Sequence, residues 1–97
     1  MARNDNVAIP ALTWTQLTNA NATALRVQSV SGSEMRLQAT NGVTAPSTLL
    51  GTIVLGGGNV LAADMTIAQL WPGVDGANRV WAFANTASVA SVSHADA

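Results

Sequence analysis

The chain has 97 residues, enough for one domain and too few for a second of ordinary size. Only 9% of the residues are charged, against about 25% in an average soluble protein, and the formal net charge of −1 excludes a basic surface for nucleic acid or anionic membranes. A hydrophobic content of 48% argues against disorder, and the absence of cysteine excludes disulfides and thiolate metal sites.

The N-terminal segment, Met1–Pro10, is predicted to be an irregular arm ahead of a single domain at residues 11–97. It is polar, lacks periodicity and closes with a proline. It contains no apolar run long enough for a signal peptide, and no window of about 18 apolar residues elsewhere predicts a transmembrane helix. We therefore expect synthesis in the cytoplasm and no membrane partner.

The rest of the chain alternates apolar and polar residues with a period of two, and turn residues recur about every 8–12 positions. Leu12–Thr18 is predicted as a strand. A hairpin is then predicted from Thr23–Val30 and Glu34–Thr40, joined by a loop at 31–33 that contains glycine. With Val30 opposite Glu34, Val27 lies opposite Leu37, and the apolar residues of both strands share one face. The other face would carry Arg26 opposite Gln38, and Gln28 opposite Arg36.

Four more strands are predicted, at Thr52–Leu55, Asn59–Ala63, Asn78–Ala84 and Ser88–His94. Between the second and third of them, Asp64 is expected to cap a helical turn over Met65–Leu70. The expected fold is all-β, a small antiparallel β-sandwich or jelly-roll-like barrel with one short helical turn.

No residue pattern predicts catalysis, a metal or a cofactor. The glycines at 56–58 lack the lysine of a phosphate-binding loop, since the chain contains no lysine. His94 is the only imidazole, and the nearby Ser91 and Ser93 share its strand rather than a sharp exposed turn. We expect His94 to be a surface or interface residue. Asp64 and Asp75 are explained by a cap and a turn, so the chain is not expected to be an enzyme.

The three tryptophans suggest two different roles. Trp81 is expected to fill the small core, because the chain has one phenylalanine and no tyrosine. Trp14 and Trp71 fit either the core or an interface, since tryptophan is also a preferred interface anchor and a platform for sugars. The position of these two rings is left open by the sequence.

The chain resembles small virion proteins of tailed bacteriophages in the runs TWTQLT, ATALRVQ, RLQAT, LAADMTIAQLWPGV, GANRVWA and SVSHADA. The resemblance covers about Leu12 to His94 and rests on strand and turn patterns. It implies a structural role in the virion, most often as a head decoration (cement) protein or a small fibre, spike or adaptor component. It also implies assembly in the host cytoplasm and binding to the major capsid protein or another virion protein.

The expected function is therefore a capsid decoration protein that stabilises the head shell as a homotrimer. A low charge content suits a protein that stays assembled, because a net charge near zero promotes association. The alternatives are a low-copy head-fibre, spike or tail adaptor component, and a carbohydrate-binding module that uses Trp14 or Trp71. The expected contact residues are Arg3, Asn4, Asp5, Asn6 and Val7 of the arm, the Arg26, Gln28, Arg36 and Gln38 face, and Trp71.

Overall fold

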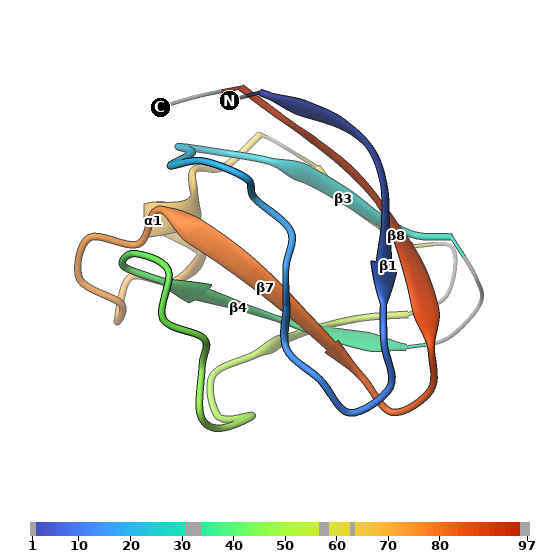
Figure 1. The fold of residues 1–97 in the computed structure, drawn as a ribbon. Coiled ribbons are helices and arrows are strands. Elements are labelled where there is room, and N and C mark those ends of the chain that lie inside the picture. Colours follow the sequence, from blue (N-terminus) through green and yellow to red (C-terminus); the bar gives the residue numbers. More distant parts are fainter. Residues whose placement is uncertain (1, 31–33, 57–58, 63, 96–97) are drawn as a thin grey trace.

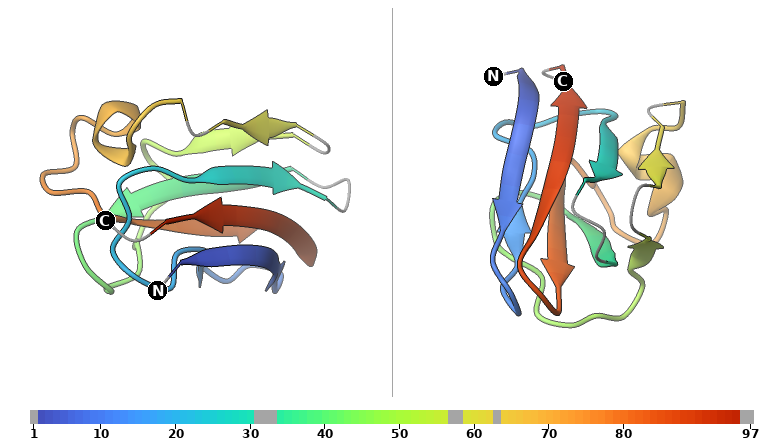
Figure 2. Two further views of the ribbon diagram at one scale, coloured as in Figure 1. Left: turned by 90° about the horizontal axis from the view of Figure 1, so that it is seen from above. Right: turned by 90° about the vertical axis from the view of Figure 1, so that its right-hand side faces the viewer.

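Two four-stranded antiparallel sheets pack face to face in the computed structural model, which describes residues 2–30, 34–56, 59–62 and 64–95 (Figures 1 and 2). Sheet A has the order β1-β8-β3-β6, and sheet B has the order β2-β7-β4-β5. The strands of sheet A are β1 (Arg3–Ile9), β8 (Ser88–His94), β3 (Arg26–Ser29) and β6 (Val60–Leu61). Those of sheet B are β2 (Thr15–Gln16), β7 (Arg79–Ala84), β4 (Met35–Thr40) and β5 (Ile53–Leu55). The predicted all-β fold is confirmed.

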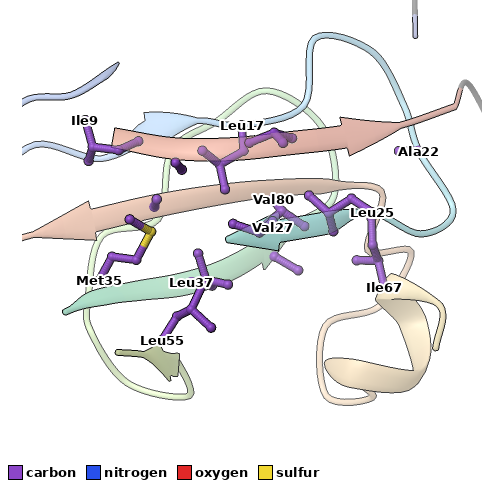
Figure 3. Close-up of a cluster of buried hydrophobic side chains, with 14 of the residues drawn as sticks. Ile9, Leu17, Ala22, Leu25, Val27, Met35, Leu37, Leu55, Ile67 and Val80 are labelled. Atoms are coloured by element: carbon purple, nitrogen blue, oxygen red, sulfur yellow. The ribbon is translucent and has the colours of Figure 1, made fainter. Parts of the chain in front are cut away.

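The core lies between the two sheets, where the alternate side chains of each strand point inward (Figure 3). In β4, for example, Met35, Leu37 and Ala39 are buried, whereas the intervening residues are only partly covered. Sheet A contributes Val27 and Val92 from its two central strands. Removing this apolar surface from water is the main force that holds the sheets together.

The predicted hairpin of residues 23–40 is wrong in its pairing. β3 pairs with β6 and β8 in sheet A, whereas β4 pairs with β5 and β7 in sheet B. Val27 and Leu37 do point inward as predicted, but they enter the core from opposite sheets. Alternation determines which residues point inward and leaves the neighbouring strand undetermined. The predicted loop at 31–33 lies outside the described residues.

The N-terminal arm is also a wrong prediction, because most of it forms β1. This strand pairs with β8 from Arg3 opposite His94 to Ile9 opposite Ser88. Ile9 is buried and Val7 packs against the core. Polar residues are frequent on edge strands, where they discourage pairing with other chains. The polar sequence of this segment therefore fits an edge strand as well as it fits an arm.

One short helix, α1 (Ile67–Leu70), lies beside one end of β7 (Figure 1). Its cap is Thr66 and not Asp64 as predicted. The Thr66 hydroxyl accepts a hydrogen bond from the Gln69 backbone N–H at 3.1 Å, and the Gln69 side chain accepts one from the Thr66 N–H at 2.8 Å. This reciprocal capping box satisfies two N–H groups at the start of the helix. Ile67 is buried, so the helix closes that end of the core.

The remaining strand predictions agree with the structure in position. The predicted strands at 52–55, 78–84 and 88–94 correspond to β5, β7 and β8, and β6 lies within the predicted 59–63. The predicted strand at 12–18 is reduced to β2, at Thr15–Gln16. The segment before β2 turns a corner between the two sheets, which a continuous strand could not do.

Candidate interaction surfaces

His94, the only imidazole, was expected to be a surface or interface residue, and in the folded chain it is buried at the end of β8. Its Nε2 accepts a hydrogen bond from the Asn19 backbone N–H at 3.4 Å, and its Nδ1 lies 3.0 Å from the Ala95 carbonyl oxygen. A neutral ring with its proton on Nδ1 satisfies both contacts. Ser91 and Ser93 project from the opposite face of β8, so neither is placed for activation by this histidine.

Within residues 2–30, 34–56, 59–62 and 64–95, no group of three or more His, Asp or Glu side chains is placed to hold a metal ion. No helix in the described part of the chain is long and apolar enough to cross a membrane. The surfaces that remain to be considered are the outer faces of the two sheets and the hollows beside them.

The outer face of sheet A carries amides and hydroxyls. The register places Asn4, Ser93 and Arg26 in one row across β1, β8 and β3. The next row is Asn6, Ser91 and Gln28. Arg26 donates a hydrogen bond from Nη2 to the Ser91 hydroxyl at 3.3 Å. We call these six residues the amide–hydroxyl face, of which only Arg26 is charged.

Alternation along β1 divides the predicted contact residues of the arm. Asn4 and Asn6 lie on the amide–hydroxyl face and are exposed. Arg3, Asp5 and Val7 lie on the other side of the strand. Val7 is partly buried and packs against the core, and it stays a predicted contact residue. The Arg3 guanidinium donates to the Leu17 carbonyl at 3.1 Å, which ties the start of β1 to the segment after β2, and it also lies 3.6 Å from the Asp5 carboxylate of the same strand.

The outer face of sheet B combines aromatic rings with arginine. Trp14 lies against Phe83, with ring centroids 5.3 Å apart and an interplanar angle of 51°. The register places Arg36 beside Phe83, and Gln16 and Gln38 on either side of Trp81. We call this set the aromatic–arginine face: Trp14, Gln16, Arg36, Gln38, Trp81 and Phe83.

The single polar face predicted for Arg26, Gln28, Arg36 and Gln38 does not exist in the structure. Arg26 and Gln28 lie outside sheet A, whereas Arg36 and Gln38 lie outside sheet B, with the whole core between them. The outward direction of all four was predicted correctly. Their separation follows directly from the wrong hairpin.

Trp81 is buried as predicted, but not in the central core. Only 8% of it is exposed, yet it lies on the aromatic–arginine face, because Val80 and Ala82 on either side of it point inward. Its indole N–H donates to the Thr40 hydroxyl at 2.8 Å. The flanking glutamine side chains explain how a ring outside the sheet is still covered.

Trp71 is a core residue, which answers the question that the sequence left open. It is 4% exposed, packs in the central cluster and donates its indole N–H to the Gly51 carbonyl at 3.2 Å. It reaches the surface only as part of a groove of about 420 Å³. The groove is lined by Gln38, Leu50, Gly51, Leu70, Trp71, Pro72, Gly73 and Val74. The prediction of Trp71 as a direct contact residue is therefore not supported by its burial.

Comparison of the chain with protein-family models, with curated proteins and with solved structures gave no significant match.

Sequence reasoning missed two features of these surfaces. The Trp14–Phe83 pair joins residues from β7 and from the segment before β2, and nothing local indicates that these segments are neighbours. Alternation along β7 does place Phe83 on the same face as Trp81, two residues earlier. The second feature is the backbone of Leu12, which adopts a positive φ of 57° without the glycine or asparagine that usually marks such a position.

Proposed function

We propose that this chain is a structural protein of tailed-bacteriophage virions, and specifically a capsid decoration protein that stabilises the head shell through protein–protein contacts. The resemblance of residues 12–94 to small virion proteins supports the class of protein. A ligand that binds only the assembled shell raises the stability of that shell by mass action. No chemistry beyond binding is needed for this role.

The aromatic–arginine face is the observation that carries the proposal. Tryptophan and arginine dominate the few residues that provide most of the binding energy in protein interfaces. Here Trp14, Phe83 and Arg36 gather on one sheet face and are all partly exposed. The glutamines beside Trp81 supply amide groups for the polar rim that surrounds such anchors. We therefore assign the contact with the capsid to sheet B.

The first test is the number of copies of the chain per purified virion, measured by quantitative mass spectrometry against the major capsid protein. A decoration protein that covers the shell is expected in hundreds of copies. A count of a few to a few dozen would instead place the protein at a vertex, fibre, spike or tail. Absence from particles would overturn the virion role and favour the sugar-binding alternative, for which the partly exposed Trp14 is the remaining candidate.

Two matched substitutions test which face binds the capsid. Arg36→Gln removes the charge from the aromatic–arginine face, and Arg26→Gln makes the same change on the amide–hydroxyl face. We expect Arg36→Gln to weaken attachment to undecorated heads at least tenfold, because an arginine at an interface centre commonly contributes more than about 1.4 kcal/mol. Arg26→Gln is expected to leave attachment within about twofold.

Attachment is measured by sedimenting heads with increasing concentrations of purified protein. Thermal unfolding of both variants is the control, since each half-buried side chain lies on a sheet surface and neither is in the core. If Arg26→Gln weakens attachment and Arg36→Gln does not, the capsid-binding face has been assigned to the wrong sheet.

A further inference from the structure

Leu12 occupies an unfavourable place in the isolated chain for two separate reasons. Its φ of 57° lies in the left-handed region, which a bulky side chain rarely adopts. Its side chain is also 67% exposed to solvent. The backbone is held there by a hydrogen bond from its own N–H to the Ala84 carbonyl at 2.8 Å, and Thr13 next to it donates its hydroxyl to the Ala11 carbonyl at 3.2 Å. The structure thus fixes an apolar side chain in water at the cost of backbone strain.

An apolar hollow of about 320 Å³ lies at the same corner of the sandwich. The corner is formed where the β1–β2 connection runs beside the β7–β8 turn (Figure 1). The hollow is lined by Ala8, Ile9, Pro10, Ala87, Ser88 and Val89. Val30, which is also exposed, donates its backbone N–H to the Val89 carbonyl at 2.9 Å. We call the hollow together with Leu12 and Val30 the corner patch.

We propose that the corner patch is a surface for self-association, in which Leu12 of one copy inserts into the hollow of a second copy. The proposal goes beyond the proposed function and does not depend on it. Strained residues are frequent where the strain serves a contact or a reaction, and the described part of the chain leaves 67% of this leucine exposed. None of the corner-patch residues is charged, so two such surfaces meet without repulsion or desolvated charge.

The position of the patch favours a closed assembly over a filament. Leu12 and the hollow lie at one corner. A rotation axis near that corner therefore lets every copy insert its Leu12 into a neighbour's hollow and receive another copy's Leu12 in its own. The apolar groove beside Trp71 is a poorer acceptor, because it lies near the Arg79 end of β7, whereas Leu12 is bonded to Ala84 at the other end. Insertion there would join copies end to end in an open chain.

The surroundings of the patch can supply the area that a stable interface needs. Such interfaces bury about 800 Å² per partner, about one-sixth of the 4860 Å² exposed by this chain. Ala8 and Val89 continue the rows of the amide–hydroxyl face by one further step towards the corner. An apolar centre at Leu12 would thereby be bordered by amides and hydroxyls, as is usual in protein interfaces.

The test is the oligomeric state of the purified full chain, measured by analytical ultracentrifugation over a range of concentrations. Leu12→Asn is the first variant, because asparagine tolerates a positive φ and its fold should be at least as stable as that of the wild type. Ala87→Glu is the second and places a charge at the hollow. Both are expected to raise the dissociation constant at least about 30-fold, the effect of losing an interface anchor. The matched control is Leu50→Asn, at a leucine that is 79% exposed in the distant groove.

A wild-type chain that forms dimers or trimers, weakened by both corner variants and unchanged by Leu50→Asn, supports the proposal. A trimer would match the homotrimer that we expect of a capsid decoration protein. A monomeric wild type at hundreds of micromolar, or an oligomer that Leu12→Asn leaves unchanged, would overturn it. Because the measurement uses only purified protein, its failure is distinct from absence of the protein from virions.

Discussion

Deletion of residues 2–9 is expected to unfold the protein. The deletion removes the whole of β1, leaves β8 paired on one side only, with β3, and takes Ile9 out of the core. Truncating one buried isoleucine to alanine costs about 2–5 kcal/mol, and a domain of this size has about 5–15 kcal/mol of stability in total. The hydrogen bond from Arg3 to Leu17, which ties β1 to the segment leading out of sheet B, is lost as well. Thermal unfolding followed by tryptophan fluorescence and near-UV circular dichroism measures the effect.

The matched control for the deletion is the double variant Asn4→Thr with Asn6→Thr. Both side chains are exposed on the amide–hydroxyl face, and threonine favours strands, so β1 and its pairing with β8 should remain. The control is expected to melt within a few degrees of the wild type. If the deleted chain also melts cooperatively at nearly the wild-type temperature, residues 2–9 are a dispensable arm after all.

Unfolding of the chain that lacks residues 2–9 would determine how its attachment to heads is interpreted. Failure of the deleted protein to bind heads would follow from loss of the fold and would say nothing about contacts made by β1. The exposed Asn4 and Asn6 have to be tested by substitution instead, with the strand intact.

The direction of the side chains could be predicted from the sequence better than the neighbours of the strands. Alternation showed that Arg26 and Arg36 point outward and that Val27 and Leu37 point inward, because a strand has only two faces. The pairing of β3 with β8 joins residues more than sixty positions apart. No local pattern encodes such a contact, and a short glycine-containing loop made the wrong hairpin the simplest interpretation.

Two other errors have different physical causes. The strand character of β1 depends on β8, since the sequence RNDNVAI has few residues that favour strands by themselves. The cap of α1, in contrast, was readable: Thr66 is followed three residues later by Gln69, which is the pattern of a capping box. Asp64 is a good cap in isolation, but the residue three positions after it is Ile67, which cannot complete the box.

The candidate surfaces were predictable only in part, because no local pattern encodes the pairing of strands that are distant in the sequence. The residue types of the aromatic–arginine face were identified as interface formers, but their gathering on one sheet requires the order β2-β7-β4. The strain at Leu12 arises from the corner between the sheets and has no signature in the residues around it.

A disulfide between Ser29→Cys and Ala90→Cys is expected to form and to stabilise the fold. The adjacent pair Val30–Val89 is hydrogen-bonded, whereas the Ser29 N–H points away from β8 and bonds to the Asn59 carbonyl just before β6. The pair Ser29–Ala90 is therefore of the close type, with about 4.5 Å between Cα atoms, and both side chains point inward. That spacing suits a disulfide. Closing a loop of about 60 residues stabilises a protein by about 4 kcal/mol in the chain-entropy estimate.

The competing pair is Gln28→Cys with Arg36→Cys, which faced each other in the predicted hairpin. In the structure these positions lie on the outer faces of different sheets, so their Cβ atoms point away from each other. We expect this variant to keep two free thiols after oxidation, and since the natural chain has no cysteine, thiol titration reports on the introduced pair alone. Mass spectrometry of the oxidised proteins and their urea unfolding curves with and without reductant complete the measurement. A bridge at 28–36 together with free thiols at 29–90 would restore the hairpin, and the two outward arginines would then share one face.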